Sequence, residues 1–320
     1  NILIYDKQKK KIVLNEPSVV AKDRKTGKLI AVGREAREML GKTPDSIEAI
    51  KPLQDGVIAD IDSTKEMITY FIHKIYGNSL FKPEVMICVP IEVTSVERKA
   101  LFDAVKGAKK IYIIEEGRAA IIGSGVNISQ PEGSMVIDIG GGSTDIAILS
   151  LDEIIASKSI RIAGNRFDED IVRYVKRKYN LLIGDRTAEK IKKEMATALK
   201  VQSPEVMEIK GRDLESGIPN TVEINANEIY EAIEDSLFQI VNSTKEVLEK
   251  CPPELAADIL DNGIVMTGGG SLIKNFIDMM EKEVGIKVFL SPNPLDSVVL
   301  GGGAAFDNKK LLRTLQMREN

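Results

Sequence analysis

Residues 135–149 read MVIDIGGGSTDIAIL, and this stretch decides the fold. A β-branched run leads to the acid Asp138, three glycines and two hydroxyl residues follow, and a second apolar run begins at Ile146. The pattern predicts a β-hairpin with a glycine tip, whose backbone N–H groups can surround a phosphate. Asp138, at the base of the tip, is placed to hold Mg²⁺ through water, because this hard cation prefers oxygen ligands and retains much of its hydration shell. A tight hairpin turn without a ligand is the alternative explanation of the same residues.

The composition is that of an ordinary globular protein, and it excludes several classes. The 320 residues are 43% hydrophobic and 29% charged, and the length allows two domains with sizeable cores. A net charge of −4 argues against a nucleic-acid binder, and a single histidine, His73, argues against a Ser-His-Asp triad. Cys88 and Cys251 lie far apart, without metal-ligand spacing. No apolar run reaches the roughly 18 residues that a membrane-spanning helix needs.

Strands and helices alternate along the chain, which predicts an α/β architecture. The order of elements is also repeated, since each half runs strand, loop, helix, strand, loop, helix. The first copy has a strand over 84–89, a helix over 94–107 and a strand over 110–114, and the second has a strand over 263–266, a helix to about Val284 and a strand over 286–290.

The front ends of the two copies match as well. Strands over 1–6 and 11–14 parallel those over 146–149 and 154–162, but the second copy has an additional strand and its glycine tip in front of them. By the logic of the repeat, we expect a strand and a first phosphate loop to precede Asn1, and the true N-terminus to lie upstream.

Two insertions interrupt this framework. One spans about 15–55 and the other about 167–224, where a 3.6-residue apolar period predicts helices over 167–179 and 187–200. A long amphipathic helix over 227–250 returns the chain to the framework. The sequence thus predicts four subdomains: IA from 1–14, 56–133 and 300–320; IB from 15–55; IIA from 134–166 and 225–299; and IIB from 167–224.

Seven motifs follow one another along nearly the whole chain. They are residues 15–21 (NEPSVVA), 55–60 (DGVIAD), 133–142 (GSMVIDIGGG), 161–164 (RIAG), 184–189 (GDRTAE), 252–255 (PPEL) and 266–271 (MTGGGS). This ordered set resembles the actin-fold ATPases and, within them, the bacterial actin family MreB. The resemblance implies an α/β actin-like ATPase fold with duplicated halves, a subdomain inserted in each and a central nucleotide cleft. It also implies ATP and Mg²⁺ as ligands and a cell-shape-determining cytoskeletal role.

The resemblance assigns roles to the matching positions. The second phosphate loop comprises Gly140, Gly141, Gly142 and Ser143, with Asp138 as the acid linked to Mg²⁺; the adenosine-side loop comprises Gly268, Gly269, Gly270 and Ser271; and the helix segment beside adenine and ribose comprises Glu189, Lys190, Ile191 and Lys192. Asn1 matches the last residue of the first phosphate loop. An alternative explanation of Glu189, Lys190 and Lys192 is that they form the solvated outer face of an amphipathic helix.

Glu116 matches the family's carboxylate that orients the attacking water, and the Ser143 hydroxyl is its expected partner. An alternative role for Glu115 and Glu116 is to stabilise the N-terminus of the following helix, where acids favour the helix dipole. Glu115 is the better candidate for that structural role. Two departures from the family pattern bear on hydrolysis: Gly117 replaces the usual Pro, and Ser143 replaces the usual Thr, whose methyl group restrains χ1. We therefore expect active but slow hydrolysis.

The resemblance further implies head-to-tail polymerisation into paired protofilaments, which lie in the cytoplasm at the inner face of the cell membrane, with no nucleic-acid partner. Leu80 and Phe81, in a turn-rich loop, match a family loop that inserts apolar side chains into the bilayer. Packing of this pair on the core is the alternative. Four basic residues near the C-terminus suit either anionic lipid or a solvated helix end: Lys309, Lys310, Arg313 and Arg318.

Two other ATPase classes are the alternatives. A sugar or acetate kinase needs a catalytic acid or base beside the γ-phosphate, and apart from Asp60 the sequence shows no obvious second acid to accompany Glu116. A chaperone-type ATPase needs a peptide-binding domain, and the sequence contains none after the ATPase region. We therefore expect an ATP-dependent filament protein of the MreB type.

Overall fold

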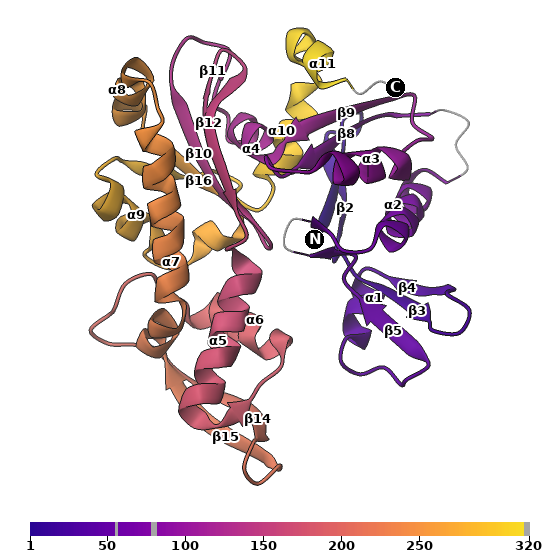
Figure 1. Ribbon diagram of the computed structural model, residues 1–320, viewed down its shortest axis with the longest axis vertical. Coiled ribbons are helices and arrows are strands. Elements are labelled where there is room, and N and C mark those ends of the chain that lie inside the picture. Colours follow the sequence, from indigo (N-terminus) through magenta and orange to yellow (C-terminus); the bar gives the residue numbers. More distant parts are fainter. Residues whose placement is uncertain (55–56, 78–81, 317–320) are drawn as a thin grey trace. The chain divides into compact units, whose positions relative to one another are not determined.

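The computed structural model describes residues 1–54, 57–77 and 82–316, and only the backbone of residues 54 and 57. The chain divides into two compact units (Figure 1). Unit 1 comprises Asn1–Gly123 and Val298–Asn320, and unit 2 comprises Ser124–Ser297. Unit 2 is therefore one uninterrupted stretch inserted into unit 1. The finer division into four subdomains stays a prediction.

A five-stranded sheet forms the centre of unit 2, in the order β12-β11-β10-β16-β17. β10 (Ser134–Ile139) and β11 (Thr144–Ser150) form the predicted antiparallel hairpin, which β12 (Glu153–Ile160) extends. β16 (Ile264–Thr267) runs parallel to β10, and β17 (Val288–Leu290) runs parallel to β16. The hairpin strands are buried along almost their whole length, as expected for the centre of a sheet covered on both faces.

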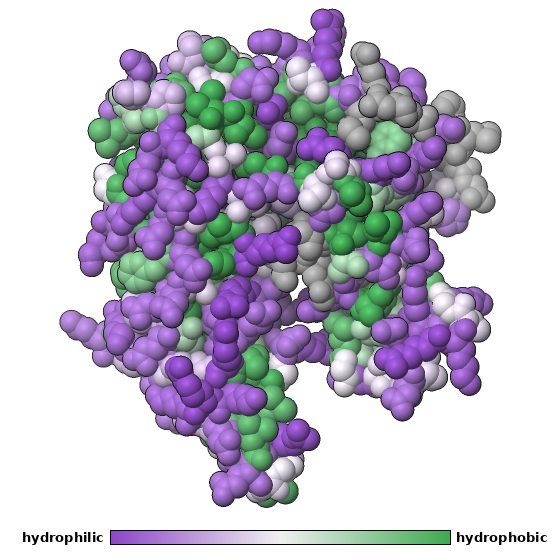
Figure 2. Space-filling model, in the orientation of Figure 1, coloured by the Kyte–Doolittle hydropathy of each residue, from purple (hydrophilic) through white to green (hydrophobic). Residues whose placement is uncertain are grey.

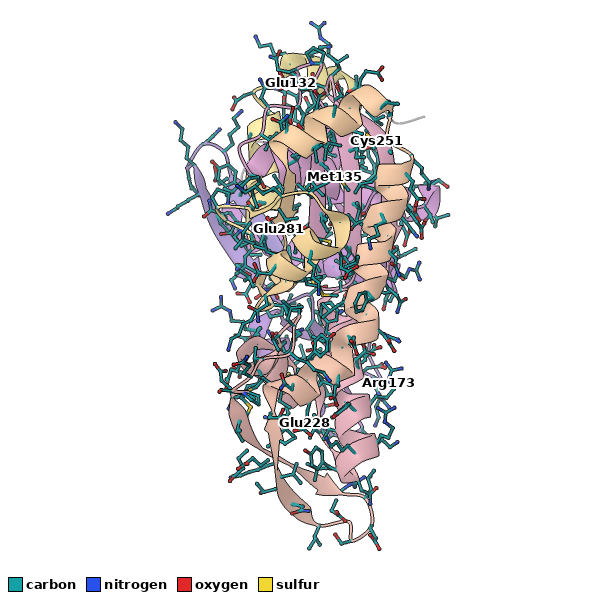
Figure 3. The ribbon with its side chains drawn as sticks, turned by 90° about the vertical axis from the view of Figure 1, so that its left-hand side faces the viewer. Glu132, Met135, Arg173, Glu228, Cys251 and Glu281 are labelled. Atoms are coloured by element: carbon teal, nitrogen blue, oxygen red, sulfur yellow. The ribbon has the colours of Figure 1, made fainter. Side chains whose placement is uncertain are left out.

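Three helices, α7 (Ala226–Glu249), α8 (Pro253–Asn262) and α9 (Phe276–Val284), lie along one face of this sheet (Figure 3). α7 begins with a capping box, in which the Asn225 side chain accepts from the Glu228 N–H and the Glu228 carboxylate accepts from the Asn225 N–H. The residues that the 3.6-residue period places on one face of α7 are all fully buried: Ile229, Ile233, Leu237, Ile240 and Val247.

The rest of unit 2 consists of α5 (Gly164–Tyr179), α6 (Asp185–Met195) and a three-stranded antiparallel sheet. The strands of this sheet are β13 (Leu181–Leu182), β14 (Val206–Asp213) and β15 (Pro219–Asn225). α5 contacts both α6 and α7, and the apolar residues of α5 and α6 belong to the same core as the large sheet.

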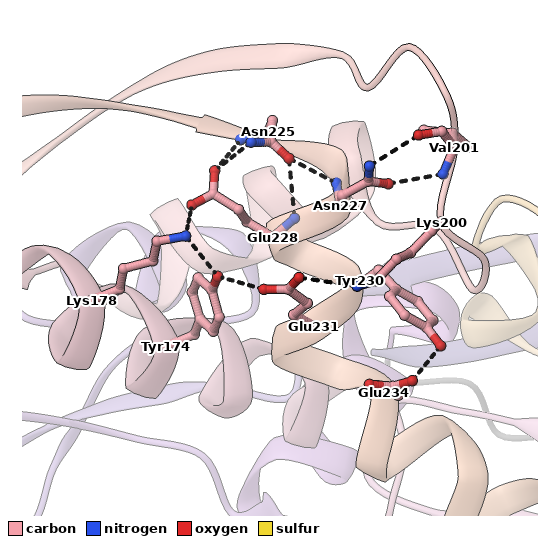
Figure 4. Close-up of polar contacts among 10 residues, drawn as sticks. All are labelled: Tyr174, Lys178, Lys200, Val201, Asn225, Asn227, Glu228, Tyr230, Glu231 and Glu234. Carbon is pink, nitrogen blue, oxygen red and sulfur yellow. Dashed lines mark hydrogen bonds and ion pairs between the residues drawn. The ribbon is translucent and has the colours of Figure 1, made fainter.

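A polar network holds α5 against α7 (Figure 4). Lys178 Nζ pairs with Glu228 Oε1 at 2.6 Å and donates to the Tyr174 hydroxyl at 3.1 Å. The Tyr174 hydroxyl donates in turn to Glu231 Oε2 at 3.1 Å. The hydrogen bond to Glu228 raises the pKa of the Lys178 ammonium, which indicates that the pair favours the charged lysine.

Two helix boundaries in unit 2 differ from the sequence prediction. The helix expected over 187–200 ends at Met195, and the helix expected to follow Ser271 begins only at Phe276, after the 3₁₀ turn η1 (Gly269–Leu272). Both differences have one cause. Thr197 forms a β-bridge with Lys274, and the neighbouring Ala198 N–H donates to the Lys274 carbonyl at 2.8 Å, which takes both segments out of helical conformation.

Unit 1 begins with β1 and β2, an antiparallel pair joined by a lysine-rich turn. A second small sheet, in the order β4-β3-β5, carries α1 and lies within the insertion predicted over 15–55. The bounds of these elements are β1 (Ile2–Asp6), β2 (Lys11–Glu16), β3 (Val20–Asp23), β4 (Leu29–Val32), α1 (Arg34–Met39) and β5 (Ile47–Ile50), followed by the short pair β6 (Leu53–Gln54) and β7 (Val57–Ile58).

Parallel strands β8 (Glu84–Val89) and β9 (Lys110–Glu115) form a further sheet of unit 1. The helices of this part are α2 (Ile61–Tyr76), α3 (Ser95–Ala104), α4 (Glu116–Gly123), α10 (Ser297–Ala305) and α11 (Lys309–Leu315). α3 begins with a capping box of Thr94 and Glu97. α4 and α10 approach so closely at Gly301 that a Cβ there would lie 1.7 Å from the Ala119 carbonyl oxygen.

Hydrophilic side chains cover most of the face seen in Figure 2, with hydrophobic ones scattered between them. Over the residues that the structure describes, no helix combines the length and the apolar character needed to cross a bilayer.

Candidate functional site

The two glycine loops of unit 2 leave the sheet side by side. β10 and β16 are parallel neighbours, with Asp138 in register with Thr267, so both strands deliver their loops at the same carboxyl end. Gly268 has a φ of +81°, and a Cβ there would lie 2.3 Å from the Ile139 carbonyl oxygen and 2.7 Å from Asp138 Oδ1. Only glycine fits at this position. Carboxyl ends of parallel strands are where ligands bind in open α/β sheets.

The backbone conformation at Gly141, in the tip of the hairpin, does not require glycine, whereas a Cβ on Gly140 would lie 3.2 Å from the Ser143 carbonyl oxygen. The Gly140 N–H donates to the Ser143 carbonyl at 2.9 Å and closes the tip. Neither Gly140 nor Gly141 has a φ in the left-handed region, and a Cβ on Gly141 would meet nothing nearer than Asn165 Oδ1 at 4.0 Å. A tight turn that needed glycine would show a positive φ at these positions. The open space above Gly141 instead favours the close approach of a ligand.

Two buried acids lie at the base of the tip. Asp138 and Asp145 are opposite each other on β10 and β11, and their exposed fractions are 5% and 1%. Burial raises the pKa of the Asp138 carboxyl to about 7, and the negative charge of Asp145 acts in the same direction. The Ser143 hydroxyl lies 3.5 Å from Asp145 Oδ2.

This pair fits the Mg²⁺ that the family resemblance implies. Carboxylate oxygens are suitable donors, and a cation would offset the cost of two neighbouring buried carboxylates. Among the described residues there is no group of three or more His, Cys, Asp or Glu side chains that could enclose a metal ion. The donor set therefore suits an ion that keeps most of its ligands as water or ligand oxygens.

α5 begins directly on the glycine tip. The Gly164 N–H donates to the Gly140 carbonyl at 3.1 Å, and the Asn165 N–H donates to the Gly141 carbonyl at 2.7 Å. Lys192, from α6, reaches the same point, where its Nζ donates to the Gly164 carbonyl at 2.7 Å. The same ammonium pairs with Asp168 at 2.8 Å. Lys192 is thus the predicted helix residue that the structure brings to the glycine tip.

The other three residues predicted on α6 have different surroundings. Glu189 pairs with Lys193 at 2.7 Å, and Lys190 is exposed. Ile191 is fully buried in the core of unit 2, so its side chain has no surface for a ligand.

The predicted residues of unit 1 lie at the ends of its strands. Asn1 precedes β1, and its amide donates to Asn15 Oδ1 at 3.3 Å. Glu116 is the first residue of α4, at the carboxyl end of β9, and is half-buried. Glu115 pairs with the buried Arg118 at 3.2 Å, and its expected action on the N-terminus of the helix stays a prediction.

The predicted membrane residues Leu80 and Phe81 lie outside the described residues, as does Arg318.

Two acids of the site were not predicted from the sequence. Asp145 could have been found, because a four-residue tip after Ile139 places it opposite Asp138 on the hairpin. Asp168 has no signal of its own in the sequence. It is one of several charged residues on α5, and only the packing of α6 brings it to Lys192.

Solved structures identify the fold as actin-like. The structure of the MamK double helical filament is 21% identical to this chain, with a TM-score of 0.79 over 93% of each chain. The crystal structure of MreB5 of Spiroplasma citri bound to AMPPNP is 38% identical, with a TM-score of 0.90, and the match covers 98% of this chain and 94% of that one. The predicted fold class is thereby confirmed.

The family is equally well defined. The family model described as MreB/Mbl protein matches residues 1–314. The cell shape-determining protein Mbl of Bacillus subtilis is 49% identical over 311 residues, which are 96% of this chain and 93% of that protein. This chain belongs to the MreB/Mbl family, as its ordered motifs predicted.

Proposed function

We propose that the chain binds Mg²⁺ and ATP at the two glycine loops, hydrolyses ATP slowly and polymerises into filaments that determine cell shape or drive movement. The observation that carries the proposal is the register of β10 on β16, which puts both loops and Asp138 at one carboxyl end. The MreB5 structure bound to AMPPNP supports the nucleotide, and the name of the Mbl relative supports the role in cell shape.

Within this proposal the loop N–H groups bind the phosphates, and Asp138 holds Mg²⁺ through water. Bound Mg²⁺ supplies charge neutralisation at the phosphate oxygens. Glu116 orients the water in line with the γ-phosphorus, and the Ser143 hydroxyl assists it. Glu189, Lys190 and Lys192 belong to the helix beside adenine and ribose, and Asn1 ends the first phosphate loop.

Filament formation needs an interface between copies that does not close on itself. Head-to-tail contact is heterologous and generates an open polymer, which we propose to assemble as paired protofilaments. The structure of the MamK double helical filament, which shares this fold, supports assembly into a filament. We further propose that Leu80 and Phe81 attach the cytoplasmic filament to the inner face of the membrane, with no nucleic-acid partner.

Light scattering on addition of Mg²⁺ and ATP tests the function directly. The proposal predicts concentration-dependent assembly, with filaments visible by electron microscopy and phosphate release that needs no acceptor. Turnover that rises with a small-molecule phosphate acceptor, without assembly, would instead establish a sugar or acetate kinase. Family membership does not favour that alternative.

A further inference from the structure

The ammonium of Lys192 is held by two residues of the same helix. It donates to the Gly164 carbonyl at 2.7 Å and to Asp168 Oδ2 at 2.9 Å, and both acceptors belong to the first turns of α5. The side chains of Lys192 and Asp168 are only 15% and 17% exposed. Among the described residues these are the partners of Lys192.

The contact extends from α6 to the glycine tip. Lys192 donates a hydrogen bond to the Gly164 carbonyl. The Gly164 N–H donates in turn to the Gly140 carbonyl, and the next N–H, that of Asn165, donates to the Gly141 carbonyl. A Cβ on Gly164 would make ordinary contacts, at 3.4 Å, with both the Gly140 carbonyl oxygen and Lys192 Nζ, so both groups lie beside this residue. The position of the tip therefore depends on where the Lys192 ammonium lies.

We infer that Asp168 is a positioning residue of the nucleotide site: it fixes the Lys192 ammonium against the first turn of α5 and, through Gly164, fixes the glycine tip for the phosphates of ATP. The inference rests on the proposed function. Without the carboxylate, four methylene groups of Lys192 regain rotational freedom, and the ammonium leaves the Gly164 carbonyl for part of the time. The glycine tip is then less well ordered before the nucleotide binds. Ordering the tip on binding costs free energy, and the affinity for ATP falls.

The ion pair with Lys192 does not fully offset the cost of burying the Asp168 carboxylate. Burial raises the pKa of its carboxyl, and the negative charges of Glu189 and Asp185 add to this effect, while Lys192 opposes it. Pairs with such a desolvation cost are weak contributors to stability, which favours a role in orienting Lys192.

Calorimetric titration with Mg²⁺ and ATP tests the inference in the full chain. Asp168→Asn should weaken ATP binding about tenfold, the effect of losing one charge-assisted hydrogen bond. Asp168→Glu keeps the carboxylate and should recover most of the affinity. Glu246→Gln is the matched control, because it breaks the Lys158–Glu246 pair at 2.7 Å elsewhere in unit 2 and should leave ATP affinity unchanged.

A double-mutant cycle separates positioning from general stabilisation. Once Lys192→Met has removed the ammonium, Asp168→Asn should weaken ATP binding by less than twofold. Equal affinity of Asp168→Asn and the unmodified chain, or full additivity with Lys192→Met, would overturn the positioning role alone. If the unmodified chain itself fails to bind ATP, the proposed function is overturned, and the positioning role with it.

Discussion

Asp138 and Asp145 face each other on neighbouring strands, and both are almost completely buried. A buried carboxylate is costly unless a cation or hydrogen bonds compensate for its lost hydration. At the scale of single residues, the two buried carboxylates therefore carry a free-energy cost that a bound cation can lower. The same reasoning makes the nucleotide-free protein sensitive to pH.

The pKa of Asp138 is about 7 in the folded chain and near the ordinary value of 3.8 in the unfolded chain. Below pH 4 both states are protonated. Between about pH 4 and 7 the unfolded chain releases this proton while the folded chain keeps it, so the free energy of unfolding falls as pH rises. We expect Asp138→Asn to remove that fall and to stabilise the nucleotide-free protein above pH 7, by at most about 4 kcal/mol.

Urea unfolding at a series of pH values, without Mg²⁺ or nucleotide, measures this effect. Asp261→Asn, an exposed change on α8, serves as the control and should leave the pH profile unchanged. If Asp138→Asn and the unmodified chain had parallel profiles, the raised pKa would be refuted.

Glu116 and Glu115 are adjacent acids with separable roles. Glu116→Ala should lower phosphate release at least about 100-fold, because the attacking water loses its orienting carboxylate, and should leave ATP affinity within about twofold. Glu115→Gln breaks the 3.2 Å ion pair with Arg118 and should instead lower the free energy of unfolding by about 1–3 kcal/mol, with phosphate release retained. A phosphate-release assay and a denaturation curve on both variants distinguish the roles, and unchanged turnover in Glu116→Ala would refute its assignment.

At the scale of elements, the sequence predicted well where local pattern determines the structure. The hairpin of β10 and β11, the capped helix α3 and the buried face of α7 all follow from apolar spacing and capping residues. The ends of α6 and the start of α9 did not follow, because the bridge between Thr197 and Lys274 joins segments far apart in the chain. The position of Asp168 at the glycine tip was hidden for the same reason, since it depends on how α6 packs on α5.

The crossing of α4 and α10 provides a test at this scale. Gly301→Ala would place a Cβ 1.7 Å from the Ala119 carbonyl oxygen, and neither backbone can yield without moving a helix. We expect the free energy of unfolding to fall by about 3 kcal/mol, a large overpacking cost. Gly107→Ala is the control, because its Cβ would meet nothing within 4 Å. Similar urea midpoints for the two variants would contradict the close crossing.

At the scale of the whole molecule, the two glycine loops were recognised from the sequence, but their contact was not. The element repeat placed each loop after a strand, and the resemblance to MreB gave each a role. That the loops meet depends on the order of strands in the sheet, in which β16 lies beside β10 although more than a hundred residues separate them. Local periodicity carries no information about such long-range pairing.

Membrane attachment belongs to this scale, because many weak contacts add up along a filament. The double change Leu80→Ser and Phe81→Ser should abolish pelleting with liposomes while ATP-dependent light scattering is retained, since the change removes the apolar anchor and leaves the nucleotide loops intact. Leu260→Ser replaces a leucine that is 60% exposed on α8, and should pellet normally. Wild-type pelleting by the double variant would refute the proposed anchor.

The insertion of unit 2 into unit 1 also sets an order of events on the ribosome. Unit 2 is fully synthesised once Ser297 has been added, whereas unit 1 still lacks the rest of α10 and all of α11. Those helices complete the apolar core around Tyr112 and Ala119, to which they contribute Ala305, Leu311 and Leu315. Because domains fold as units during synthesis, the part of the chain made second becomes a finished domain first, and the part made first must wait for α10 and α11.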